Sequence, residues 1–197
     1  MESVWLVGSP AFVLFARLLL ASVFLMAGTG KALDWKGSIL AVERYRILPA
    51  ALAKAYGACL PLVDIAIAAL LYLGITVYGA GLASLTLLSF VIAAGIVIRR
   101  GTHLDCGCFG LLYRERIGRV TVARDVVLLL LAVDMLLLDN GRFALTAIMK
   151  GIQEPVNALV LFLVLLSFIA TLGIIAFGYR RRIRPLVISQ EAQLIQR

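Results

Sequence analysis

The chain has 197 residues, of which 62% are hydrophobic and 15% charged, and its net charge is +8. A soluble globular domain carries roughly 25% charged residues and about half apolar ones. The mean hydropathy of +1.03 therefore excludes that class and indicates an integral membrane protein. The positive charge does not predict nucleic-acid binding, because Lys and Arg gather at the edges of apolar runs, where topology and anionic lipid headgroups account for them.

Five apolar runs approach the roughly 20 residues that a helix needs to cross the hydrocarbon core of a bilayer. They cover about 11–33, 51–73, 76–98, 120–138 and 156–178. Only helices and closed barrels satisfy the backbone in lipid, so the sequence predicts an all-α, polytopic membrane helical bundle. We expect residues 1–197 to form a single membrane domain ending in a basic tail, 179–197. The first run is too long for a signal peptide and lacks a basic segment before it, so we expect it to persist as a helix.

Two connections carry local signals. The segment DWKGSILAVERYRILP, between the first two runs, mixes apolar and charged positions. With Ser38 as N-cap and Pro49 as a stop, it predicts a short helix lying in the membrane interface. Pro155 is suited to the first turn of the last helix.

The distribution of Lys and Arg predicts the orientation. With five spans, the loops 34–50 and 99–119 and the basic tail share one side and hold most of the basic residues, whereas the other side offers only Arg142 and Lys150. By the positive-inside rule the N-terminus lies outside and the C-terminus in the cytoplasm. We expect a bacterial-type plasma (inner) membrane.

The stretch GTHLDCGCFG, between the third and fourth runs, holds two of the three cysteines and the only histidine. Gly107 lets the backbone bring Cys106 and Cys108 together, and a disulfide that closes so small a ring should be strained and easily reduced. His103 and nearby arginines favour the thiolate form, whereas Asp105 opposes it. The pattern predicts a redox-active cysteine pair and favours a thiol–disulfide oxidoreductase.

Other interpretations of the thiols stay open. Cys59, early in the second run, is either a third thiol that forms an alternative disulfide or a packing residue. His103, Cys106 and Cys108 could ligate a soft ion such as Cu(I), while zinc would need Asp105 as a fourth ligand. A non-enzymatic assembly or scaffold protein is a further alternative. We expect no dedicated cofactor, with a quinone or a soft metal left open.

Several charged residues fall within or at the ends of the apolar runs, where they need partners or water. They are Arg17, Lys31, Asp64, Arg124, Asp125 and Asp134. By depth we expect Asp64 near the midplane and an Arg17–Asp134 pair, with Asp64 competing for Arg17. Arg124, about a turn inside the loop-side boundary, would either snorkel or help to polarise the thiols. These charges fit a role in holding helices together as well as a catalytic one.

One face of the first helix is expected to carry Arg17, Phe24, Gly28 and Lys31. Gly28 would permit the close approach of a neighbouring helix.

The string DCGCFG after the third run resembles the signature of the methylamine-utilisation MauE family, within the wider DoxX-like group of membrane proteins. The stretch ARLLLASVFLMAGTGKALDW is similar to the first helix of that family, and YRILP, PLVDIAIAALL and Arg124 also fit. The resemblance covers roughly 12–138. Asp64 stands where the family commonly has Glu, which keeps a carboxylate but shortens it.

The resemblance implies a four-helix core with an added fifth transmembrane helix and tail. It also implies a role in thiol–disulfide traffic that supports the maturation of exported proteins, alongside a thioredoxin-like partner. Disulfides form outside the cytoplasm, whereas the charges put this cysteine pair inside. Three explanations would resolve this conflict. The protein passes electrons across the membrane, the loop folds into the bundle, or the predicted orientation is inverted.

Overall fold

The computed structural model describes residues 10–101, 118–138 and 155–195, and within them all regular structure is α-helical. The helices are α2 (Pro10–Leu33), α3 (Trp35–Arg44), α4 (Ala50–Tyr72), α5 (Thr76–Arg99), α6 (Arg119–Leu138) and α8 (Pro155–Ile195). The predicted all-α fold is confirmed, and each long helix begins within one residue of its predicted start.

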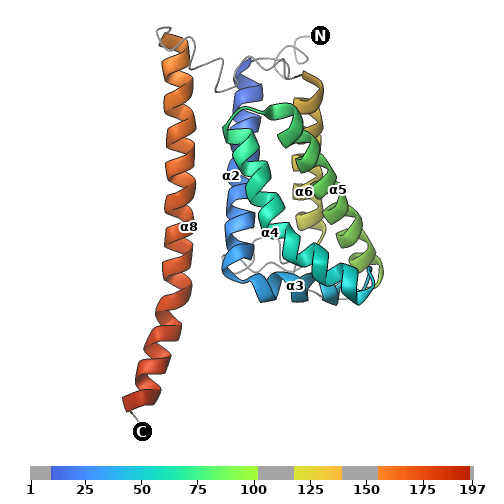
Figure 1. Cartoon of the computed structure of the whole chain (residues 1–197), viewed down its shortest axis with the longest axis vertical. Helices are drawn as coiled ribbons and strands as arrows, with labels where there is room; N and C mark the ends of the chain where they lie inside the picture. Colours follow the sequence, from blue (N-terminus) through green and yellow to red (C-terminus); the bar gives the residue numbers. More distant parts are fainter. Residues whose placement is uncertain (1–9, 102–117, 139–154, 196–197) are drawn as a thin grey trace.

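Helices α2, α4, α5 and α6 run side by side and enclose the main core (Figure 1). Many buried core residues are small, and this allows backbones to approach closely where lipid supplies no hydrophobic drive for helix association. The core cluster comprises Ala16, Leu20, Ala21, Phe24, Ile67, Ala68, Leu71, Ala80, Ala83, Leu87, Leu128, Ala132 and Met135. All four helices contribute to it, so they form one packing unit.

Four helices in the described part of the chain are long and apolar enough to cross a membrane. They contain the spans Phe12–Leu33, Ala50–Tyr72, Thr76–Arg99 and Leu161–Arg180. Helix α6 carries more charge, but its 20 residues measure about 30 Å at 1.5 Å per residue, the thickness of the hydrocarbon core. It lies within the bundle beside α5 (Figure 1). The protein is therefore a polytopic helical membrane protein.

The short helix α3 lies across one end of the bundle (Figure 1). The N-cap predicted at Ser38 is wrong, because Asp34 caps the helix by accepting a hydrogen bond from the Gly37 backbone N–H at 3.0 Å. Ser38 is instead buried, and its hydroxyl donates to the Gly57 carbonyl of α4 at 3.1 Å. A Cβ at Gly57 would lie 2.8 Å from Cα of Ile39, so glycine is needed where α3 meets α4.

Helix α8 stands at the side of the bundle and contacts it mainly through α2 (Figure 1). It begins at Pro155, as predicted, and continues past the predicted end of the span to Ile195. A seam of hydroxyl groups joins it to the core. Ser22 Oγ lies 3.0 Å from Tyr72 Oη and 3.1 Å from Ser167 Oγ, and the Tyr72 and Phe168 rings meet edge to face at 5.4 Å.

Candidate functional site: a buried charge cluster

The α3 end of the bundle contains a buried ion pair between α2 and α4. Lys31 Nζ donates to Asp64 Oδ2 at 2.5 Å, and the two side chains are only 3% and 0% exposed. The Phe90 ring of α5 lies 4.9 Å from Lys31 Nζ, a distance at which the face of an aromatic ring stabilises a cation. Three helices therefore converge on one ammonium group.

Gly28 makes this pairing sterically feasible. A Cβ there would lie 2.8 Å from Ile65 Cγ1 and 2.9 Å from the Ile65 backbone nitrogen. The close approach of a neighbouring helix at Gly28 is therefore confirmed, and the predicted face is buried at all four of its positions. Asp64 lies near the middle of α4, yet it meets α2 beside Gly28, five residues before that helix ends. This offset brings the carboxylate within reach of Lys31.

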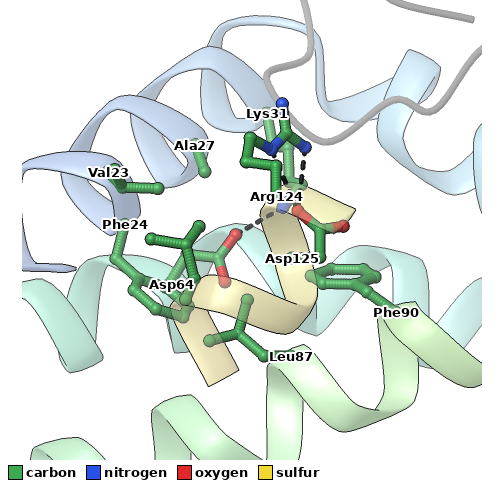
Figure 2. Close-up of a pocket in the computed structure, with 10 residues that line it drawn as sticks. Val23, Phe24, Ala27, Lys31, Asp64, Leu87, Phe90, Arg124 and Asp125 are labelled. Carbon is green, nitrogen blue, oxygen red and sulfur yellow. Dashed lines mark hydrogen bonds and ion pairs between the residues drawn. The ribbon is translucent and has the colours of Figure 1, made fainter. Parts of the chain in front are cut away.

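A second charged pair lies on α6. Arg124 donates from Nε and Nη2 to Asp125 Oδ1 at 3.0 and 2.9 Å, and the two side chains are 31% and 5% exposed. Figure 2 shows both pairs around one small cavity of about 30 Å³. Asp64 Oδ1, also at this cavity, has no hydrogen-bond partner among the described residues. A cavity of this volume has room for a water molecule, and the free Asp64 oxygen would offer that water one polar partner.

The predicted Arg17–Asp134 pair stays a prediction, whereas Asp64 is bound to Lys31 and not to Arg17. Arg17 is 2% exposed on α2. It lies 11 residues from Gly28, or about 16 Å along the helix. Because Asp64 lies beside Gly28, Arg17 is too far along α2 to reach the Asp64 carboxylate. Asp134 Oδ2 has no hydrogen-bond partner in the described part of the chain.

The predicted redox loop lies outside the described residues. His103, Asp105, Cys106, Gly107 and Cys108 all belong to the segment 102–117. The chain enters that segment after α5 and leaves it just before α6, at the bundle end that carries α3 (Figure 1). Among described residues, no three His, Cys, Asp or Glu side chains group closely enough to hold a metal ion.

Cys59 is a free thiol, exposed on α4 and nine residues into that helix. It is not a packing residue of the core. Phe90 is the cluster member that sequence reasoning missed. Phe90 stands within an apolar run, and the sequence alone does not distinguish a phenylalanine that contacts a cation from one that faces lipid.

These features define a class: polytopic helical membrane proteins with a buried, glycine-packed ion pair and a Cys-Gly-Cys sequence between two helices. The chain belongs to the MauE family, described as methylamine utilisation protein MauE, whose model matches residues 9–138. The matched part contains α2, α3, α4, α5 and α6, and with them every residue of the main core cluster, whereas α8 lies outside it.

Two curated proteins are similar to this chain. The methylamine utilization protein MauE of Paracoccus denitrificans is 33% identical over 125 residues, which cover 62% of this chain and 67% of that protein. MauE of Methylophilus methylotrophus is 33% identical over 110 residues, which cover 55% of this chain and 57% of that protein. No solved structure is significantly similar.

Proposed function

We propose that this protein is a membrane thiol–disulfide redox protein. It exchanges electrons through Cys106 and Cys108 with a thioredoxin-like partner during the maturation of exported proteins. Membership of a family described by methylamine utilisation supports a membrane accessory role. The observation that carries the proposal is the pairing of two features: a Cys-Gly-Cys sequence in the connection from α5 to α6, and buried charges at the bundle end where those helices open into it.

The exchange needs two steps. The thiolate of one cysteine attacks a sulfur of the partner disulfide, so one S–S bond breaks and a mixed disulfide forms, releasing a partner thiolate. The second cysteine then attacks the mixed disulfide, closes the Cys106–Cys108 bond and releases the second partner thiolate. Two electrons pass to the partner, and the two protons lost by the cysteines balance its two thiols. The reverse sequence oxidises the partner.

Arg124 is the described residue best placed to support this chemistry from the bundle. It lies six residues after Gly118, where the described chain resumes, and its side chain is 31% exposed. A cation near a thiol favours the thiolate form, which is the attacking species. Asp125 orients the guanidinium through two hydrogen bonds. Lys31 and Asp64 fix the helices behind it.

The orientation is part of the proposal. Basic residues on the loop side put the Cys-Gly-Cys connection and the C-terminus in the cytoplasm and the N-terminus outside, in a bacterial plasma membrane. Maturation of exported proteins then requires electrons to cross the bilayer. In the opposite orientation the cysteine pair would lie outside the cytoplasm and could exchange electrons with exported proteins without any transfer across the bilayer.

The thiol states of cells expressing a Cys59→Ser variant test the function. Trapping the thiols with acid and alkylating them with a mass-shifting maleimide should reveal both a dithiol and a disulfide form. The ratio should change when cells are treated with an oxidant or a reductant. A pair that stays reduced in oxidising growth while the purified protein holds one copper or zinc ion would contradict the redox function and favour metal binding.

A further inference from the structure

A second hollow lies on the outside of the bundle, at the same end as the charge cluster. It is a groove of about 400 Å³ between the end of α3, the start of α4 and the second half of α5. Apolar side chains form most of its walls, among them Val42, Ile47, Leu48, Ile92 and Ala93. The volume falls within the range of about 300–1,000 Å³ typical of small-molecule sites.

A cation holds one wall of the groove in shape. Arg100 Nη1 donates to the carbonyls of Tyr45 and Arg46 at 3.0 and 3.2 Å. Arg46 has a φ of 49°, which residues other than glycine seldom adopt and which persists only where the surroundings impose it. Two further lining residues, Tyr56 and Ser89, join α4 to α5, because Tyr56 Oη lies 2.7 Å from Ser89 Oγ. The groove is thus a built feature and not a gap between loosely packed helices.

The segments around the groove are strongly basic. Within 42–56 and 89–100 the one acidic residue is Glu43, which lies 3.9 Å from Lys54. The basic residues of these segments are all exposed: Arg44, Arg46, Lys54, Arg99 and Arg100. An apolar groove bordered by cations is complementary to a molecule with an apolar chain and an anionic head.

We propose that this groove binds an anionic phospholipid, with one acyl chain between α3, α4 and α5 and the phosphate against Arg46 and Arg100. Juxtamembrane Lys and Arg attract anionic lipids of the adjacent leaflet, and tyrosines such as Tyr45 and Tyr56 suit the headgroup level. Phe90 lines both the groove and the cavity beside Lys31, so the lipid would touch the support of the buried pair. The proposal is independent of the thiol chemistry.

The test uses the full chain, purified in a neutral detergent, incubated with phosphatidylglycerol or phosphatidylcholine of identical acyl chains, and examined by native mass spectrometry. Wild type should retain one phosphatidylglycerol in preference to phosphatidylcholine. Arg46→Gln removes one cation but keeps the two backbone carbonyls to which Arg100 donates. It should reduce this preference about fivefold, since one basic residue near the surface is worth roughly 1 kcal/mol. Arg180→Gln on exposed α8 is the matched control and should leave the preference unchanged.

Ala93→Trp would fill the groove and should abolish retention, whereas Ala66→Trp, on an exposed position of α4, should not. Gel filtration identifies any variant that fails to fold, and Arg46→Gln then decides the question alone. Equal retention of the two lipids by wild type, or retention that Ala93→Trp and Arg46→Gln leave intact, would overturn the proposal. So would a stoichiometric neutral quinone in place of phospholipid.

Discussion

Lys31 at the end of α2 and Asp64 in the middle of α4 form a 2.5 Å ion pair that is almost completely closed to its surroundings. Removing one partner of a buried pair leaves an uncompensated charge and typically costs about 3–5 kcal/mol. We expect Lys31→Met to lower the free energy of unfolding in detergent by about this amount, measured by thermal or denaturant titration. The double change Lys31→Met with Asp64→Leu should recover most of the loss, because no charge is left behind.

The Lys54–Glu43 pair is the matched control. Its atoms are 3.9 Å apart and the side chains are 66% and 26% exposed, so Glu43→Gln should change stability by no more than about 1 kcal/mol. Equal effects of Lys31→Met and Glu43→Gln would show that the Lys31–Asp64 pair is solvated.

Gly28 should tolerate no side chain. Gly28→Ala would push a Cβ to 2.9 Å from the Ile65 backbone nitrogen and should destabilise the protein by about 1–3 kcal/mol through overpacking. Gly95 on α5 has nothing within 4 Å of an added Cβ, so Gly95→Ala should be neutral or slightly stabilising. A Gly28→Ala protein that melts like wild type would mean that α2 and α4 separate easily at this level.

The sequence predicted the long helices well, because apolar runs are bounded by polar residues and by prolines such as Pro49 and Pro155. It drew attention to the charged residues within the runs, but it did not predict that Lys31 pairs with Asp64. Estimating depth from the position in each run assumes that the helices are untilted and that their ends are aligned. In the structure α4 instead meets α2 with Asp64 beside Gly28, near the end of α2. The Ser38 cap was wrong because Asp34 captures Gly37 first, and this leaves Ser38 free to bind α4.

Helix α8 is expected to be an addition to a self-sufficient core, because no residue of α8 belongs to the main core cluster. A chain ending after residue 138 should unfold cooperatively in detergent and remain sensitive to Lys31→Met. Aggregation of this shorter chain, with wild type soluble under the same conditions, would contradict the division. In the full chain, Ser167→Ala removes one hydroxyl contact with Ser22 and should cost about 0.6 kcal/mol.

The orientation can be measured on intact cells. In a background of Cys59→Ser, Cys106→Ser and Cys108→Ser, an impermeant maleimide should label Arg142→Cys and spare Arg182→Cys. The reverse pattern would invert the topology. Labelling of both would show that an even number of spans, and not one, separates these two positions.

Trapping the partner tests the redox function most directly. Cys106→Ser and Cys108→Ser, each in the Cys59→Ser background, remove the resolving thiol in one of the two cases, so the mixed disulfide with the partner can no longer be released. One of the two variants should accumulate a covalent adduct with a thioredoxin-like protein, visible on non-reducing gels and lost on reduction, while Cys59→Ser alone shows none. Absence of an adduct in both variants, together with loss of bound metal in both and in His103→Ala, would contradict the thiol–disulfide function.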